Sequence, residues 1–169
     1  YGLINGCLNE ELKTNPSNSY GIAKDSLRRF IEELNKEYEF NYKWIRLFFI
    51  FWEGQGEKSI LSLLDKAIQN NEKEFNMSGG EQLRDYLNIK NVVKNILLIS
   101  NQTLFSNQII NCCNGKPISI RKLVENHLNK KEYNIKLNLG FYSYPNHEPM
   151  AFWGDNTKLN LIKKGRKWK

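Results

Sequence analysis

Long apolar runs, paired cysteines and histidine clusters are all missing from this sequence. No stretch approaches the ~20 consecutive apolar residues that a membrane-spanning helix needs, and none reads as a signal peptide. The chain has three cysteines and two histidines, with no Cys-x-x-Cys pair and no metal-ligand spacing. These absences argue against a zinc site, a disulfide framework and a membrane protein. They predict a protein of the reducing cytoplasm without a metal.

Excess charge is also scarce once the carboxyl end is set aside. The net charge is +7, but five of the positive charges lie at the end of the chain, on Lys163, Lys164, Arg166, Lys167 and Lys169. The rest of the chain then carries only +2, five fewer than the whole. A nucleic-acid-binding module is one interpretation of the basic end, but no aromatic-basic repeat accompanies it. We therefore expect a solvated terminus and no nucleic-acid partner.

Helical and strand-like patterns alternate along the chain, which predicts an α/β fold. The segment 44–51 is apolar on both faces, as a buried parallel strand requires. Residues 1–15 read as an irregular loop, 53–56 as a turn, and Cys112 and Cys113 as packed thiols. The predicted helices are 20–38, 59–69, 92–99, 119–128 and 156–163, and the predicted strands are 44–51, 82–89, 108–113 and 133–139. His127 is expected on the surface of its helix.

The most informative stretch is the start of the first predicted helix. Asn15-Pro16-Ser17 is a turn and cap signal, with Ser17 or Asn18 able to accept the first free helical N–H groups. Tyr20 and Lys24 follow, and residues four apart lie on one helical face. A lysine ammonium one turn from a phenol favours the ionised phenol. The pair is therefore suited to exchange a proton with a sugar hydroxyl or ketone.

The spacing by itself is weak, because a plain structural interpretation fits it as well. Tyr20 could be an aromatic that packs at a helix start while Lys24 is solvated. The same spacing recurs at Tyr86 and Lys90, within a strand-like stretch, and we interpret that copy as incidental. The segment 54–59 superficially suggests a dinucleotide-binding glycine fingerprint, but its third glycine position is Ser59, so we read it as a turn.

Several motifs in a fixed order resemble one enzyme family. Tyr20 and Lys24 match a Tyr-x-x-x-Lys pair, and 79–86 (GGEQLRDY) matches a Gly-x-Gln-x-Arg-Asp-Tyr segment. The segments 111–120 (NCCNGKPISI) and 155–159 (DNTKL) match the turn and the closing motif that follow. In this order the chain resembles the extended short-chain dehydrogenase/reductases, the NAD-dependent epimerase/dehydratase family. The segment 148–155 resembles a subgroup that reduces nucleotide-linked 4-keto-6-deoxyhexoses.

The resemblance implies a fold and a division of the chain. It implies the carboxyl-terminal portion of a Rossmann-type doubly wound sheet plus a small substrate-binding region, with the amino-terminal dinucleotide-binding half missing. Residues 1–56 would end the Rossmann-type core, and 57–169 would form mainly the substrate-binding region with some returning core elements. The family's glycine-rich phosphate loop and catalytic Ser/Thr would both lie before Tyr1. The chain alone is therefore expected not to oxidise NADH or NADPH.

The resemblance also implies roles for single residues. Tyr20 would be the acid/base, and Tyr20 and Lys24 would hold the ribose of NAD or NADP. Arg84 would bind the diphosphate of a nucleoside-diphosphate sugar, because guanidinium groups make bidentate bonds to phosphate. Its plain alternative is an ion pair with Asp85 or a neighbour. The candidates for the nucleobase are Phe75 and Asn76, with weaker substrate candidates at Glu148, Trp153 and Lys158.

Two functions remain open from the sequence. The first is a nucleotide-sugar reductase or epimerase, present as a fragment and able to form a homodimer through the helix that carries Tyr20. The second is a catalytically inactive remnant that binds at most a nucleotide sugar or a protein partner.

Overall fold

The computed structural model describes residues 1–52, 55–56, 59–145 and 148–165 of the chain. Five helices occur in these ranges: α1 (Ser19–Glu37), α2 (Ile60–Gln69), α3 (Ile89–Ser100), α4 (Ile120–Lys131) and α5 (Thr157–Lys164). The strands are β1 (Gly6–Leu8), β2 (Lys43–Leu47), β3 (Phe49–Phe51), β4 (Glu74–Asn76), β5 (Leu83–Arg84), β6 (Tyr86–Asn88), β7 (Gln108–Cys112), β8 (Ile118–Ser119), β9 (Lys136–Asn138) and β10 (Phe152–Gly154). The predicted turn at 53–56 and the basic end lie partly outside the described residues.

Side-chain caps set where the helices begin. The Asn18 carboxamide oxygen accepts from the Gly21 N–H at 2.8 Å, so the cap predicted at Ser17 or Asn18 is Asn18. Ser59 and Ser119 cap α2 and α4 in the same way. Each satisfies one of the free N–H groups in a first helical turn. The five predicted helices are therefore confirmed in place and type, with shifts at their ends.

The prediction of one buried strand over 44–51 is wrong. The chain forms two strands that change partners at Phe48, because β2 pairs in parallel with β7 and β3 pairs in parallel with β6. Within the described residues each of these strands has a neighbour along one edge. Leu47 and Phe49 are accordingly 47% and 40% exposed. The parallel pairing is as expected, but the burial on both faces is not.

The strand predicted over 82–89 is also divided. Its residues form β5 and β6, and α3 begins already at Ile89 because the Asn88 side chain caps it through the Lys90 N–H at 2.9 Å. The loop predicted over 1–15 contains β1, which pairs in parallel with β10. Strands of two or three residues are too short for an alternating pattern to show, so the sequence did not indicate β1, β4, β8 or β10.

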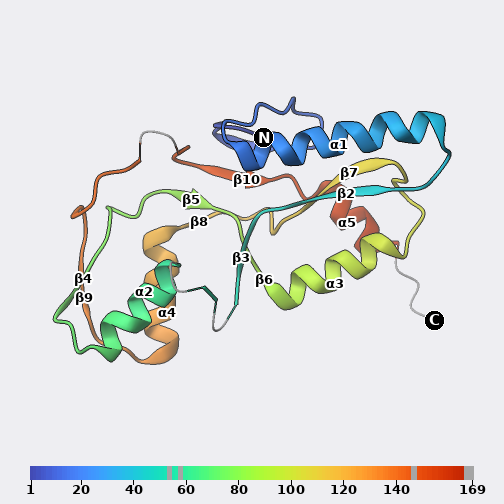
Figure 1. The fold of residues 1–169 in the computed structure, drawn as a ribbon. Coiled ribbons are helices and arrows are strands. Elements are labelled where there is room, and N and C mark those ends of the chain that lie inside the picture. Colours follow the sequence, from blue (N-terminus) through green and yellow to red (C-terminus); the bar gives the residue numbers. More distant parts are fainter. Residues whose placement is uncertain (53–54, 57–58, 146–147, 166–169) are drawn as a thin grey trace.

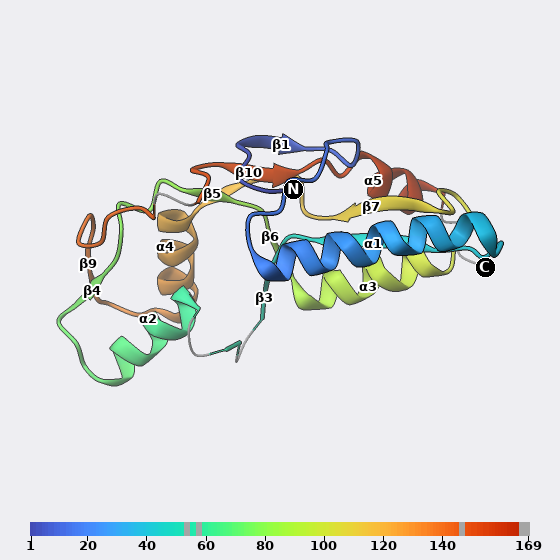
Figure 2. The same ribbon diagram turned by 45° about the horizontal axis from the view of Figure 1, so that its top comes forward.

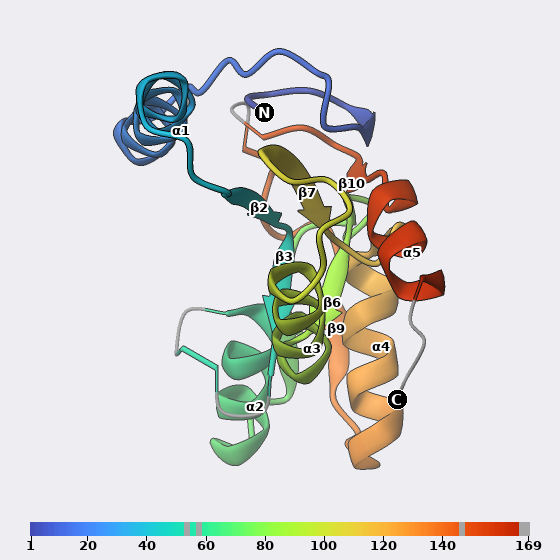
Figure 3. The same ribbon diagram turned by 90° about the vertical axis from the view of Figure 1, so that its right-hand side faces the viewer.

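The elements form two regions that meet along the middle of the molecule. In one region α1 and α3 lie on opposite sides of the β2–β7 pair (Figures 1 and 3). In the other, α2 and α4 pack together beside the β4–β9 pair (Figure 2). None of the helices in the described ranges is long and apolar enough to cross a membrane.

Each region has its own apolar core. Leu64, Phe75, Met77 and Val124 are buried between α2, α4 and β4. Ile99, Ile110 and Leu159 are buried between α3, α5 and β7. No residue of α1 is fully buried, and Ile22, Leu27 and Phe30 on this helix are 52%, 47% and 63% exposed. The helix that carries Tyr20 therefore buries little of its surface against the rest of the described chain.

The sequence predicted that His127 lies on the surface of α4, but the structure places it at the contact between two helices. Its imidazole Nε2 lies 2.7 Å from an oxygen of Asp65 on α2, and its side chain is only 16% exposed. The pair joins the two helices at the edge of the core. The other histidine, His147, lies outside the described residues.

One buried carboxylate ties the two regions together. Asp85 is fully buried, and its oxygens accept from the N–H groups of Asn114 and Gly115 at 2.8 Å and of Gly154 at 3.2 Å. Gly154 is needed there, because a Cβ at this position would lie 2.5 Å from the sulfur of Cys113. The junction of β5 and β6 is thereby fixed to the end of β7 and to β10.

Replacement of Asp85 by alanine is expected to destabilise the chain. The change leaves the N–H groups of Asn114, Gly115 and buried Gly154 without this acceptor, so we expect the free energy of unfolding to fall by about 3 kcal/mol. The measurement is urea unfolding followed by circular dichroism. Glu125→Ala is the control, since it removes only partly exposed ion pairs with Arg121 and Lys122 and should cost under about 1 kcal/mol. Equal losses in the two variants would contradict the role given to Asp85.

The cysteines offer a second test of the fold. Cys112 and Cys113 are free and buried, as predicted, and burial raises the pKa of both thiols; Cys7 is free and exposed. Partial burial raises the pKa of Cys7 as well, but its thiol is exposed, so at pH 8 we expect iodoacetamide to label Cys7 alone in the folded chain. Mass spectrometry of peptides should find three labelled cysteines after denaturation. Labelling of Cys113 in the folded chain at the rate of Cys7 would rule out this packing.

Candidate functional site

The Tyr20 cavity lies between the start of α1 and strands β2 and β3. It has a volume of about 810 Å³, and its wall includes Tyr20, Lys24, Arg46, Phe49 and Phe152. The Asn18 cap orients the first turn of α1 so that Tyr20 and Lys24 share one face of the helix. The Lys24 ammonium lies 5.8 Å from the centre of the Tyr20 ring, and the Tyr20 side chain is 73% exposed. The two groups therefore point into the same open cavity.

A second phenol lines the Tyr20 cavity. The Tyr1 hydroxyl donates to the Asn111 side-chain oxygen at 2.5 Å, and the Arg46 guanidinium lies over its ring at 4.4 Å. Burial raises the pKa of the Tyr1 phenol, although Arg46 and Asn111 act in the opposite direction. Tyr1 thus stays protonated near neutral pH and serves as part of the wall.

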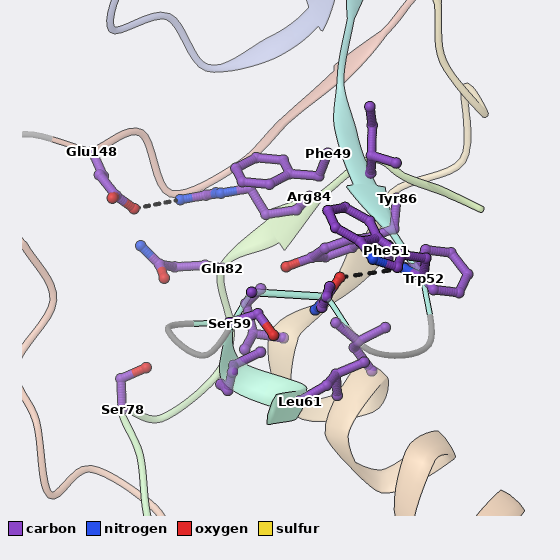
Figure 4. Close-up of a pocket in the computed structure, with 16 residues that line it drawn as sticks. Phe49, Phe51, Trp52, Ser59, Leu61, Ser78, Gln82, Arg84, Tyr86 and Glu148 are labelled. Carbon is purple, nitrogen blue, oxygen red and sulfur yellow. Dashed lines mark hydrogen bonds and ion pairs between the residues drawn. The ribbon is translucent and has the colours of Figure 1, made fainter. Parts of the chain in front are cut away.

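The Arg84 cavity lies on the other side of β3. Its volume is about 800 Å³, and it is enclosed by β3, the start of α2, β5, β6 and part of α4 (Figure 4). Its polar side chains are those of Gln55, Ser59, Ser78, Gln82, Arg84, Tyr86 and Glu148, among mainly apolar neighbours. Phe49 lines both cavities, so the two adjoin at this ring.

Arg84 is held firmly in its cavity. It is only 3% exposed, and its Nη1 donates to the carbonyl oxygens of Leu83 at 3.0 Å and Met150 at 3.3 Å. The guanidinium carbon lies 4.8 Å from the centre of the Phe152 ring and 5.9 Å from that of Phe49. Arg84 is therefore positioned where the two cavities meet.

The plain alternative for Arg84 was an ion pair, and the structure contains one with Glu148 rather than Asp85. The Arg84 Nη2 donates to a Glu148 oxygen at 3.1 Å. Asp85 is excluded because successive strand residues face opposite sides, and its carboxylate is occupied by backbone N–H groups.

Phe75 and Asn76 lie apart from both cavities. Phe75 is buried in the α2–α4 core, and the Asn76 side-chain oxygen accepts from the Asn138 amide at 2.8 Å. Neither residue is in the described lining of the Tyr20 or Arg84 cavity. Of the weaker candidates, Glu148 lines the Arg84 cavity, whereas Lys158 bonds to Gln108 at 3.1 Å and Trp153 belongs to β10.

Sequence reasoning missed the aromatic residues at the junction. Phe49 was included only in an apolar strand, and Phe152 only in the segment 148–155, with no role given to either ring. Gln82 had one, since it stands two residues before Arg84 in the motif quoted above. Tyr86 does lie in a strand while Lys90 lies in α3, so they do not share a helical face as Tyr20 and Lys24 do.

Comparison with known proteins establishes the family to which this chain belongs. The model of the NAD dependent epimerase/dehydratase family matches residues 1–113, which is more than half of the chain. The chain belongs to this family. The resemblance inferred from the motifs is thereby confirmed at the level of the family, as is a Rossmann-like α/β fold.

Relatives of this epimerase/dehydratase chain are about twice its length. It is 32% identical over 158 residues to the dTDP-6-deoxy-L-talose 4-dehydrogenase (NAD(+)) of Aggregatibacter actinomycetemcomitans, covering 90% of this chain and 56% of that protein. A UDP-glucuronic acid 4-epimerase from Bacillus cereus, solved with UDP-glucuronic acid and NAD, superposes with a TM-score of 0.81 at 20% identity, covering 100% of this chain and 54% of the other. RMD from Pseudomonas aeruginosa, solved with NADPH, gives 0.80 at 17% identity, covering 92% and 52%. The chain therefore spans about half the length of the relatives it matches.

Groups of three or more His, Cys, Asp or Glu side chains able to hold a metal ion do not occur within the described ranges. Two charged residues that line the Tyr20 cavity, Asp25 and Arg28, are paired with each other. Asp25 on α1 accepts from Thr14 at 3.0 Å, from Arg28 at 2.9 and 3.0 Å and from Arg29 at 2.9 Å. This cluster fixes the first turns of α1 to the preceding loop.

Asp25 makes the stability of α1 depend on pH. Burial alone would raise its pKa, but hydrogen bonds from Arg28 and Thr14 and the charges of Arg28 and Arg29 hold the pKa below its usual value. Because the folded-state pKa is lowered, the stabilisation is present above the unfolded-state pKa of about 3.9 and is lost as the pH falls through the folded-state value. We expect Asp25→Asn to lower the free energy of unfolding by about 1.5 kcal/mol at pH 7, and by much less at pH 2. Chemical unfolding at both pH values measures the difference, and an equal loss at the two pH values would contradict it.

Proposed function

We propose that this chain forms the substrate side of an NAD(P)-dependent nucleotide-sugar oxidoreductase that reduces a 4-keto-6-deoxyhexose. The observation that carries the proposal is the meeting of two cavities at Phe49, one with Tyr20 and Lys24 and the other with buried Arg84. The similarity to a dTDP-6-deoxy-L-talose 4-dehydrogenase supports this class of sugar. The proposed setting is the cytoplasm, in deoxysugar or polysaccharide synthesis.

In this proposal Tyr20 is the acid/base. Its exposed hydroxyl gives a proton to the oxygen of the sugar C4 as the ketone is reduced, and the Lys24 ammonium one turn away stabilises the phenolate that remains. Epimerisation would use the same pair in both directions, with removal and then return of the proton and hydride.

The residues in the Tyr20 cavity suit the nicotinamide riboside portion of NAD or NADP. The Tyr20 hydroxyl and the Lys24 ammonium are donors for ribose hydroxyls, and Phe48 and Phe49 supply an apolar wall beside them. When bound, the cofactor supplies or accepts the hydride. The glycine-rich turn for its phosphates is not in this chain.

Arg84 is proposed to bind the substrate diphosphate. A buried guanidinium recognises phosphate oxygens strongly because its N–H groups form charge-assisted, bidentate bonds. A sugar that reaches from Arg84 toward Tyr20 would pass the rings of Phe49 and Phe152. Phe75 and Asn76 remain candidates for the nucleobase, although neither lines either cavity.

A dimer through α1 is a further part of the proposal. The exposed apolar residues Ile22, Leu27 and Phe30 on this helix provide a surface that a second copy could cover. The alternative function is an inactive remnant that only binds a nucleotide sugar or a protein partner. The chain spans about half the length of these relatives. The alternative is favoured if no dinucleotide-binding half accompanies the chain.

Tyr20→Phe tests the catalytic part of the proposal. We expect kcat for a dTDP-4-keto-6-deoxyhexose to fall about 10²- to 10⁴-fold, because the proton donor is lost while its ring is kept. The assay is NADH oxidation by the chain fused behind the dinucleotide-binding half of the Aggregatibacter relative. Tyr38→Phe is the matched control, since Tyr38 is also exposed but stands at the far end of α1.

The outcome separates the two functions. Unchanged turnover in Tyr20→Phe would exclude Tyr20 as the acid/base. No turnover by the unsubstituted fusion, with retained binding of the nucleotide, would favour the inactive remnant. The chain without a fused half is expected to show no NADH oxidation.

A further inference from the structure

The ion pair between Arg84 and Glu148 occupies the group that the proposed function assigns to the diphosphate. The Arg84 Nη1 is bonded to two carbonyl oxygens, while its Nη2 faces a Glu148 oxygen at 3.1 Å. Carboxylate and phosphate oxygens are equivalent acceptors for a guanidinium N–H. A ligand phosphate that bonds to Nη2 must therefore compete with the Glu148 carboxylate.

The two partners of this ion pair are buried very differently. The Arg84 side chain is 3% exposed, whereas that of Glu148 is 48% exposed. Arg84 is also held by two carbonyl groups and lies against the Phe49 and Phe152 rings. Among the described residues, Arg84 is the one cation that Glu148 pairs with. Glu148 can turn into water at little cost, and Arg84 cannot.

Gln82 supplies a second donor beside this ion pair. Its side-chain Nε2 is buried, and the described chain offers it no hydrogen-bond partner. In Figure 4 the Gln82 carboxamide lies on the Arg84 cavity between Glu148 and Ser78. A buried donor without an acceptor is unfavourable, so a ligand oxygen at this place would be bound more tightly.

We propose that the Glu148 carboxylate stands in the free chain where an anionic oxygen of the nucleotide sugar binds, and that this ligand displaces it. The diphosphate then bonds to Arg84 Nη2 and to Gln82 Nε2, and Glu148 turns outward because two anions would otherwise repel each other. Glu148 is in this view a residue that lowers the affinity for the ligand rather than one that binds it. This inference rests on the proposed function, since it assumes a diphosphate on Arg84.

The test is the dissociation constant of UDP, measured by calorimetry for the 169-residue chain and its variants. We expect Glu148→Gln to bind UDP about three- to tenfold more tightly, because it removes a competing charge of ordinary surface strength. Gln82→Leu should bind UDP several-fold more weakly. Uridine, which has no phosphate, should bind Glu148→Gln and the unsubstituted chain equally. Glu125→Gln is the matched control for charge, because its ion pair with Arg121 lies outside the cavity lining.

The results distinguish failure of the inference from failure of the proposed function. If UDP binds, Arg84→Met abolishes binding, and Glu148→Gln binds no more tightly than the unsubstituted chain, the inference is overturned while the function stands. If neither the unsubstituted chain nor any variant, including Glu148→Gln, binds UDP, the inference and the proposed function are both overturned. Thermal melting of each variant confirms that it is folded, and Glu148→Ala provides a second way to remove the carboxylate.

Discussion

The carboxylate of Asp85 is the interaction on which the rest of the structure depends. It is completely buried and accepts from three backbone N–H groups that belong to the segment after β7 and to β10. A charge buried so deeply is tolerated only because these donors replace water. The result is a rigid junction between β5, β6, β7 and β10. Arg84, the last residue of β5, directly precedes Asp85, and its side chain faces the other way, into the cavity.

This junction also explains the position of the aromatic residues. Phe152 stands on β10 and Phe49 on β3, and both rings contact the Arg84 guanidinium. Their faces attract the cation and keep water from it. Tyr20 and Lys24 reach the same place from α1, which is attached much more loosely and leaves its apolar residues exposed. The site thus combines a rigid side around Arg84 with a side that depends on one helix.

Much of the helical structure could be predicted from the sequence, as could the strands β7 and β9, whereas the shorter strands and the strand pairing could not. Asn18, Ser59 and Ser119 are local cap signals followed by helical periodicity, so α1, α2 and α4 were placed correctly. The prediction of one strand over 44–51 was wrong because the change of pairing partner at Phe48 produces no pattern in the local sequence. The short strands β1 and β10 pair over more than 140 residues of chain, and His127 meets Asp65 across two helices. Such contacts depend on the packing of distant segments, which periodicity does not report.

The sequence by itself determined the family, the helix that carries Tyr20 and Lys24, and the candidacy of Arg84, because each rests on residues close together in the chain. Only the tertiary structure decided that Arg84 pairs with Glu148 and not Asp85, that Gln82 has a buried donor without a partner, and that Phe49 separates two adjoining cavities. The physical reason is that ion pairing, burial and cavity shape are set by side chains from separate strands. Their distances follow from how β3, β5 and β10 are brought together, and no short motif encodes that arrangement.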